Sequence, residues 1–328
     1  MNAAYPAPSH PLRIGTRGSA LALAQAHETR DRLMAAHDLP ADAFEIVPIK
    51  TTGDRILDRP LKEIGGKGLF TREIEDALLD GSIDIAVHSM KDMPVLQPEG
   101  LVIDCYLPRE DVRDGFVSRI HRSIAELPAG TRVGSSSLRR RAQLIHARPD
   151  LVVVEFRGNV QTRLRKLDEG VADATFLAMA GLARLGMTAV AAGAVAPEEM
   201  LPAVAQGAIG IERRADDSVA ASLVAAISDL STTLRVEAER AFLARLDGSC
   251  ETPIAGLAEL QPDGTLLLRG QILLPDGSLS LTGERRGAAQ DGPAMGTDLA
   301  DELLGRAPED FFELMGISAD RGSPPVGR

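Results

Sequence analysis

The first 90 residues alternate between short apolar runs, which are typical of strands, and longer periodic stretches, which are typical of helices. In the longest periodic stretch Leu21, Ala24 and Leu33 fall on roughly one helical face. The predicted elements are strands at 12–16, 44–49 and 83–87, a helix at 20–37 and a helix that opens at Thr71. Strands and helices that alternate at this spacing predict βαβ units and a mainly parallel sheet with right-handed crossovers.

The same order of elements begins again near residue 132. The sequence Arg-Val-Gly-Ser at 132–135 echoes Arg-Ile-Gly-Thr at 13–16, and a helix is predicted after each. The later elements of this second unit are a strand at 151–156, a helix at 159–167, a strand at 174–177 and a short helix that ends near Gly186. We expect a second α/β domain, from which the segment 202–211 crosses back to the first.

The pattern changes after Ser231. One amphipathic helix reaches Leu246, alternating segments follow at 254–260, 266–273 and 279–283, and helices lie near the end, which predicts a smaller α+β domain. We therefore predict three domains, at 11–107 with 208–229, at 108–207 and at 230–317. Residues 1–10 and 318–328 are expected to be disordered, the latter because the segment is rich in Gly, Pro and Ser.

Composition removes several classes of protein. A chain of 328 residues that is 44% hydrophobic and 25% charged has enough apolar material to fold. The longest apolar run, 187–196, is shorter than the ~18 residues of a membrane span. Residues 1–11 lack the pattern of a signal peptide, so we expect a cytoplasmic protein with no membrane partner. A net charge of −11 with 3% aromatic residues disfavours nucleic acid as a partner.

The two cysteines have to be judged singly. Cys105 and Cys250 cannot form a disulfide framework and lack the spacing of a metal site, so we expect no metal. Cys105 lies in a strand-like stretch and is expected to be structural. Cys250 lies in a loop of small residues, where an open thiol fits a nucleophile or an attachment point. No histidine lies nearby in sequence to activate it.

Arginines gather where predicted strands run into helices. Of the 36 basic residues 31 are arginine, whose rigid fork suits carboxylates and phosphates. A helix N-terminus adds unpaired N–H groups and a positive dipole end, so such turns are candidate anion sites. The first turn carries Arg17 and Ser19, and the second carries Ser137 followed by Arg139 and Arg140.

Apolar spacing predicts how the second group of arginines faces. Leu138, Ala142 and Ile145 lie at i, i+4 and i+7 and form the expected core face, so Arg139 and Arg140 are predicted to point away from the core. Cations at a helix N-terminus oppose the macrodipole, and an arriving anion would offset both. The alternative is a solvated basic face.

Two further groups follow strand ends. Arg157 and Arg163 repeat the arrangement, about one helical turn apart. Lys91 and Asp92 follow the strand at 83–87, and ligands bind at the carboxyl ends of parallel strands. Asp92 is a candidate for acid/base work or for stabilising a cation, and Lys91 for holding an anionic group. The alternative for Asp92 is a structural turn before the proline that follows.

Taken together, seven segments resemble the porphobilinogen deaminase (hydroxymethylbilane synthase) family over residues 12–315, in the order that the family has them. They are Arg-Ile-Gly-Thr-Arg at 13–17, Gly-Gly-Lys-Gly-Leu-Phe at 65–70, Ala-Val-His-Ser-Met-Lys-Asp at 86–92, Ser-Ser-Leu-Arg-Arg at 136–140, Arg-Gly-Asn-Val at 157–160, Gln-Gly at 206–207, and Glu-Arg at 239–240 ahead of Gly-Ser-Cys-Glu-Thr-Pro at 248–253.

The resemblance implies an α/β fold of two domains similar to periplasmic-binding-protein lobes plus a smaller α+β C-terminal domain. It implies a transferase that deaminates four porphobilinogen molecules, joins them head to tail on a covalent dipyrromethane primer and releases linear hydroxymethylbilane by hydrolysis, in haem biosynthesis. The primer's thioether maps onto Cys250 and the catalytic aspartate onto Asp92. We expect a monomer. The resemblance also assigns cofactor binding to Lys91, Ser137, Arg139 and Arg140, and substrate binding to Arg17, Ser19, Arg157, Arg163, Lys67 and Gln206.

This chemistry agrees with the charge pattern. Each porphobilinogen unit carries two carboxylates, so clustered arginines are needed to hold a growing chain in an acidic protein. Loss of ammonia leaves a methylene-pyrrole cation, which a carboxylate at Asp92 would stabilise, and an aspartate among arginines should stay ionised. The Gly-rich stretch at 51–68 would suit a lid over the site.

Two other classes explain less. A non-catalytic anion-binding lobe protein has no use for Cys250 in an open loop and would need export. A cysteine hydrolase needs a histidine partner for Cys250, and His88 is the only one beside a motif. A cysteine hydrolase would also leave the excess of arginine unexplained.

Overall fold

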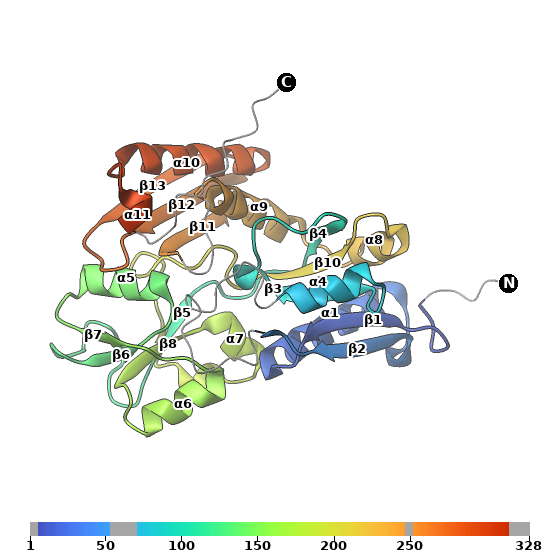
Figure 1. Cartoon of the computed structure of the whole chain (residues 1–328), viewed down its shortest axis with the longest axis horizontal. Coiled ribbons are helices and arrows are strands. Elements are labelled where there is room, and N and C mark those ends of the chain that lie inside the picture. The colour runs from blue at the N-terminus through green and yellow to red at the C-terminus, as the bar shows by residue number, and fades with distance from the viewer. Residues whose placement is uncertain (1–5, 53–70, 247–251, 315–328) are drawn as a thin grey trace.

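The structure is a computed structural model that describes residues 6–52, 71–246 and 252–314. Figure 1 shows two α/β units side by side, one coloured blue and cyan and one coloured green, with a third unit in orange and red packed against both. The C-terminal unit contacts the first through α9 (Leu230–Arg245) and β4 (Leu101–Tyr106). It contacts the second through α5 (Leu138–Ala147) and β12 (Thr265–Leu273). The predicted α/β class with a smaller α+β unit is confirmed.

The first unit is built on a five-stranded sheet. Its strands lie in the order β2 (Phe44–Ile49), β1 (Leu12–Arg17), β3 (Ile85–Ser89), β10 (Ile209–Arg214) and β4 (Leu101–Tyr106). Its helices are α1 (Ala20–His37), α4 (Arg72–Leu79) and α8 (Ser218–Ala225), with a short 3-10 turn at Ala41–Ala43. The strands and helix predicted before residue 50 are confirmed almost to the residue. β3 begins two residues later than predicted. Before it, Ile83 donates a backbone hydrogen bond to the Ala77 carbonyl at the end of α4, and Asp84 donates one to the Arg13 carbonyl of β1.

The second unit repeats this design with a second five-stranded sheet. Its strands lie in the order β7 (Val152–Val154), β6 (Arg132–Gly134), β8 (Ala174–Ala178), β5 (Asp114–Ser118) and β9 (Gly193–Ala194). Its helices are α5 (Leu138–Ala147), α6 (Val160–Asp168) and α7 (Met179–Arg184), with a 3-10 turn at Thr188–Val190. The order β2-β1-β3 of the first sheet matches β7-β6-β8 of the second, which confirms the restart near residue 132.

Both sheets contain more antiparallel pairing than the sequence predicts. In each, the first strand of the motif pairs in parallel with two neighbours, β1 with β2 and β3, and β6 with β7 and β8. The fourth strand, β10 or β5, is antiparallel to both of its neighbours. β5 and β10 follow the two segments that cross between the units, so each enters its sheet from the opposite direction. Local periodicity carries no information about that direction.

Two glycines mark equivalent places in the repeated motif. A Cβ on Gly15 would lie 2.3 Å from Cδ1 of Ile83, and a Cβ on Gly134 would lie 2.4 Å from the Phe156 ring. A real side chain cannot approach so closely, so glycine lets a large apolar residue pack directly on the strand that leads to each candidate anion turn.

The third unit packs two helices on a three-stranded antiparallel sheet. The elements are α9 (Leu230–Arg245), β11 (Ile254–Leu260), β12 (Thr265–Leu273), β13 (Ser280–Ala288), a 3-10 turn at Ala289–Asp291, α10 (Gly292–Arg306) and α11 (Phe311–Leu314). Its core is built around the fully buried Phe242 and also includes Met90 and Met93, which belong to the first unit. The loop that carries Lys91 and Asp92 is therefore anchored in the core of the C-terminal unit.

The three sheets are the basis on which we propose the domain boundaries 11–107 with 208–229, 108–207 and 230–317. One expectation about the chain ends is wrong in part. Residues 7–10 form a turn closed by backbone hydrogen bonds of 2.8 and 3.1 Å between Ala7 and His10, whereas 1–5 and 318–328 lie outside the described residues.

Over the described ranges, no single helix has the length and hydropathy of a membrane span. The bent pair α8 and α9 meets that test jointly, by length and composition only.

Candidate active site

Asp92 is presented by a short, firmly anchored turn. β3 runs directly into a 3-10 turn at Met90–Asp92, and Met90 and Met93 on either side are buried at 1% and 5% exposure. Asp92 itself is exposed. The two methionines hold the backbone while the carboxylate faces outward.

Two contacts support this turn from other elements. Ser89 forms a hydrogen bond through its hydroxyl with the buried amide of Gln25 on α1, at 2.8 Å to Nε2 and 3.0 Å to Oε1. Arg240 of α9 donates from Nη2 to the carbonyls of Pro94 and Val95, at 2.8 and 3.1 Å. The Asp92 turn is thus held between the first unit and α9, the helix that leads toward Cys250.

Arg17 and Ser19 lie at the same edge of the first sheet. β1 pairs in parallel with β3, so the end of β1 at Arg17 lies beside the end of β3 at Ser89. Ser19 is the N-cap of α1 and accepts a hydrogen bond from the Ala22 N–H at 3.3 Å. The predicted strand-turn-helix motif is therefore present, with Ser19 committed at least partly to capping.

The arginines of α5 are not where the sequence pattern placed them. Arg139 and Arg140 are buried, at 4% and 6% exposure, whereas Leu138 and Ile145 are only partly buried. The prediction that both arginines point away from the core is wrong. The reason is that this side of α5 meets Asp114, a counter-ion on β5 that local spacing does not reveal. The N-cap is Ser137, as expected for a helix that begins at residue 138.

Asp114 binds both guanidinium groups. Its Oδ2 accepts from Nη2 of Arg139 and its Oδ1 from Nη2 of Arg140, each at 2.7 Å, and its side chain is fully buried. Burial alone would raise the pKa of this carboxyl, but the two arginines hold it well below its usual range. The Nε2 amide of Gln206 donates to the same Oδ1 at 3.0 Å and to the Val112 carbonyl at 2.7 Å. Sequence reasoning missed Asp114, which only the contact across 25 residues reveals.

Arg163 follows the third candidate anion turn, at the start of α6. Its guanidinium donates from Nε to the Gly158 carbonyl at 2.9 Å, in the turn that Asn159 caps. Burial and the charge of Arg140 lower the pKa of Arg163 to about 10, and Glu155 and Asp92 oppose that shift. Arg157 ends the segment after β7 and is half-buried. Arg163 thus lies within range of charges from both α/β units.

Lys91 completes the cluster. Burial lowers the pKa of its ammonium group, Arg140 and Arg139 lower it further, and Asp92 and Asp114 act in the opposite direction. Electrostatic interactions therefore connect Lys91, on the Asp92 turn, with Arg139 and Arg140 of α5, and connect Arg163 of α6 with Arg140 and Asp92. We call Lys91, Asp92, Arg139, Arg140 and Arg163 the charged cluster.

The charged cluster fits a ligand that carries carboxylates. The Nε–H groups of Arg139 and Arg140 are buried and, within the described part of the chain, have no hydrogen-bond partner. Such donors favour an acceptor that arrives with a ligand, and carboxylates match the guanidinium fork. The dipyrromethane that the sequence resemblance implies carries such carboxylates, so these residues fit it.

Several predictions lie outside the described residues. Cys250, Lys67 and most of the 51–68 stretch fall in the parts of the chain that the structure does not describe. Cys105 is buried at 1% exposure, as expected of a structural cysteine. No group of three histidine, cysteine or acidic side chains among the described residues could hold a metal ion.

Comparison with known proteins agrees with the residue pattern. The family described as "Porphobilinogen deaminase, dipyromethane cofactor binding domain" matches residues 12–222, and "Porphobilinogen deaminase, C-terminal domain" matches 233–305. Porphobilinogen deaminase of Paracoccus denitrificans (strain Pd 1222) is 77% identical over 308 residues, which are 94% of this chain and 98% of the relative. Chloroplastic porphobilinogen deaminase of Pisum sativum is 56% identical over 306 residues, which are 92% of this chain and 83% of the relative.

Solved structures with a likeness to the chain are much more distant in sequence. A putative methionine-binding lipoprotein from Bacillus subtilis subsp. subtilis str. 168 is 12% identical, with a TM-score of 0.42 over 69% of this chain and 93% of the lipoprotein. The two family matches and the two close relatives extend over most of the sequence, through all three units of the fold. The chain therefore belongs to the porphobilinogen deaminase family.

Proposed function

We propose that Asp92 is the catalytic carboxylate of this enzyme and that Cys250 carries its cofactor. The activity follows from the family: the chain is a transferase of haem biosynthesis that builds hydroxymethylbilane from porphobilinogen with a dipyrromethane cofactor. The observation that supports Asp92 is its place in the charged cluster, where its charge acts on both Lys91 and Arg163.

Asp92 is suited to stabilise positive charge. When ammonia leaves porphobilinogen, the methylene carbon and the pyrrole nitrogen share a cation. An exposed carboxylate on a turn held by two buried methionines needs no rearrangement to meet that cation.

Lys91, Arg139 and Arg140 are suited to hold the cofactor, and Ser137 fixes the helix that presents the two arginines. The cofactor, when bound, supplies the pyrrole end to which the first substrate is joined. The guanidinium and ammonium groups bind the carboxylates of the cofactor. They thereby hold these carboxylates away from Asp92, whose negative charge would repel them.

Substrate carboxylates are assigned to Arg163 of the charged cluster and to four residues that are not part of it. Arg17 ends β1 of the first unit and Arg163 lies on α6 of the second, so each unit contributes a guanidinium group. The proposed substrate-binding residues are Arg17, Ser19, Lys67, Arg157 and Arg163. We assign Gln206 to support of Asp114 instead, because it is 1% exposed and its Nε2 binds Asp114 and Val112.

Intact mass of the purified protein tests the proposal. The chain should weigh more than its sequence by two porphobilinogen units less two ammonia molecules. Cys250→Ala should lose that increment and the activity, whereas Cys105→Ala, the matched control, should keep both. A fully active wild-type chain of unmodified mass would refute the assignment of Cys250.

We also propose that the enzyme is a cytoplasmic monomer. Sedimentation equilibrium of the purified enzyme would test the monomer.

A further inference from the structure

Among the described residues, Asp114 is the only acidic side chain that forms ion pairs with Arg139 and Arg140 of α5. We infer that Asp114 is a positioning residue, which sets the directions in which Arg139 and Arg140 present their remaining donors to ligand carboxylates. This inference rests on the proposed role of the two arginines.

The contacts fix each guanidinium at two points. Arg139 donates from Nη1 to the Leu201 carbonyl at 2.8 Å and from Nη2 to Asp114 at 2.7 Å. Arg140 donates from Nη1 to the Phe176 carbonyl at 2.9 Å and from Nη2 to Asp114 at 2.7 Å. A planar group held at both terminal nitrogens cannot rotate, so the direction of each Nε–H is determined. In both side chains that N–H is the donor without a partner among the described residues.

Charge balance gives Asp114 a second effect. Arg139, Arg140 and Lys91 act on one another as like charges, and Asp114 is the buried anion that offsets them before any carboxylate arrives. Because Asp114 is fully buried, its effect is exerted at low local dielectric. Without it the arginines would repel each other and separate, and the fork geometry that a carboxylate needs would be lost.

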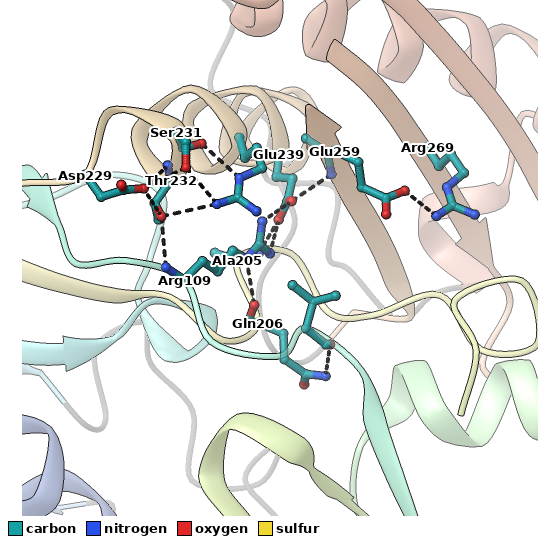
Figure 2. A network of polar contacts seen from close by, with 12 residues as sticks. Arg109, Ala205, Gln206, Asp229, Ser231, Thr232, Glu239, Glu259 and Arg269 are labelled. Carbon is teal, nitrogen blue, oxygen red and sulfur yellow. Dashed lines mark hydrogen bonds and ion pairs between the residues drawn. The ribbon is translucent and has the colours of Figure 1, made fainter. Parts of the chain in front are cut away.

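Asp114 also links the arginines to both segments that cross between the units. It is the first residue of β5, directly after the outgoing segment, and it accepts from Gln206 on the returning one. The Gln206 carbonyl in turn accepts from Nε of Arg109 at 2.9 Å, and Arg109 is paired with Glu239 on α9 (Figure 2). The orientation of the two arginines is thereby coupled to the crossing segments and to the helix that leads to Cys250.

The direct test is Asp114→Asn in the full-length enzyme, which keeps the shape of the side chain and removes its charge. Three quantities are measured: the fraction of purified chains that carry the cofactor by intact mass, the distribution of covalent intermediates after addition of porphobilinogen, and the melting temperature. We expect turnover to fall at least tenfold. The Asp114→Asn chains should either lack the cofactor or stall after the same number of porphobilinogen additions as the Arg139→Leu or Arg140→Leu chains.

The control separates positioning from simple loss of stability. Leu127→Ala opens a cavity in the core of the same unit and should lower the melting temperature without touching the arginines. At a temperature where both variants are folded, Leu127→Ala should carry the cofactor and elongate normally. If it stalls like Asp114→Asn, the effect is one of stability and the inference is wrong.

Two further variants keep the test decisive. If Asp114→Asn does not fold, Gln206→Met removes one hydrogen bond from Asp114 without changing any charge, and it should shift the same intermediates by a smaller factor. The double variant Asp114→Asn with Arg140→Leu should lose less turnover than the product of the fold-losses of the two single variants, because both substitutions act through the Arg140 guanidinium. If Asp114→Asn and Gln206→Met elongate normally while the arginine variants stall, only the inference about Asp114 is overturned. If the arginine variants themselves elongate normally, the proposed function is overturned.

Discussion

Arg109 donates two hydrogen bonds to Glu239, at 2.6 Å to Oε1 and 3.0 Å to Oε2, and neither side chain is exposed to solvent. The same carboxylate accepts from the backbone N–H of Ala205 at 2.6 Å and of Ala258 at 2.8 Å. Figure 2 shows how these contacts converge from both crossing segments, α9 and β11. One carboxylate therefore joins the C-terminal unit to the place where the two α/β units connect.

Removing the charge of Glu239 should destabilise the whole protein. Glu239→Gln leaves the buried guanidinium of Arg109 without a counter-ion and replaces an acceptor by a donor. We expect the free energy of unfolding to fall by about 3–5 kcal/mol, the range for a broken buried ion pair. Urea denaturation measures it. Arg286→Gln is a matched control, since its pair with Asp263 is more than half exposed and should contribute less than about 1 kcal/mol. Equal losses in the two variants would contradict the assignment.

Asp92→Asn should separate chemistry from folding. The side chain is exposed, so the melting temperature should stay within about 2 °C of the parent. Turnover should fall by at least ~100-fold, the scale of removing a preorganised charge stabiliser. Steady-state rates with porphobilinogen, on protein shown by mass to carry the cofactor, give the comparison. Near-normal turnover would mean that Asp92 only shapes the turn.

The arginines around the cluster should fail at different stages. Loss of one charge-assisted contact costs roughly 1.5–3 kcal/mol where it is used, which is about tenfold to a hundredfold. Arg17→Leu, Arg157→Leu and Arg163→Leu should therefore accumulate distinct covalent intermediates, separable by mass in steps of one pyrrole unit. The corresponding lysine variants should stall less completely, because lysine keeps the charge but not the fork.

Arg141 is the control for this series. It lies next to Arg140 on α5 but is exposed, so Arg141→Leu should elongate normally. If Arg141→Leu stalls like the others, the effect comes from loss of positive charge in general and not from particular contacts.

Cys105 should be chemically silent in the folded enzyme. Its thiol is 1% exposed and donates to the Val224 carbonyl at 3.2 Å, and burial raises its pKa to about 12. Iodoacetamide at pH 8 should leave Cys105 unmodified until denaturant is added, as peptide mass mapping would show. Labelling of Cys105 in the native protein would place it outside the core.

How far the sequence predicts this fold depends on the range of the interactions. The motifs at 12–19 and 132–138 are local: a short apolar strand, a glycine, a serine cap and a helix, and the structure has each where the pattern puts it. Arg139 and Arg140 show the limit. Hydrophobic periodicity predicts that an arginine points outward. Asp114, the counter-ion that accompanies the burial of Arg139, lies 25 positions earlier in the sequence, on β5.

The prediction of mainly parallel sheets misses the antiparallel strands for a related reason. β5 and β10 enter their sheets after the chain has crossed between units, and their direction is decided by that crossing rather than by their own residues. The candidate site rests on Lys91, Asp92 and Arg163, which the sequence selects because each follows a strand end. Electrostatic interactions connect Asp92 with the other two in the structure, and their roles stay predictions. Gln25 and Arg240 support the Asp92 turn through contacts of long sequence separation, which no local signal announces.

Glu75 provides a prediction about pH that is independent of the reaction. It lies on α4 at 8% exposure, near Glu212, His88 and Asp76. Burial raises its pKa above the ordinary value of 4.5, the charges of Glu212 and Asp76 act in the same direction, and the Thr71 hydroxyl and His88 oppose them. Glu75 therefore binds its proton more tightly in the folded than in the unfolded chain.

The sign of the effect on stability follows from that difference. As pH rises above about 4.5 the unfolded chain releases the Glu75 proton first, so the free energy of unfolding falls until the folded chain releases it too. Glu75→Gln cannot titrate. Its stability relative to the parent should increase with pH above 4.5 and then level off, by about 1.4 kcal/mol for each unit by which the pKa is raised. Urea denaturation of both proteins between pH 4 and pH 8 measures this difference. Leu79→Gln, at an exposed position of the same helix, should differ from the parent by the same amount at every pH. A flat difference for Glu75→Gln would show that burial does not hold the proton on Glu75.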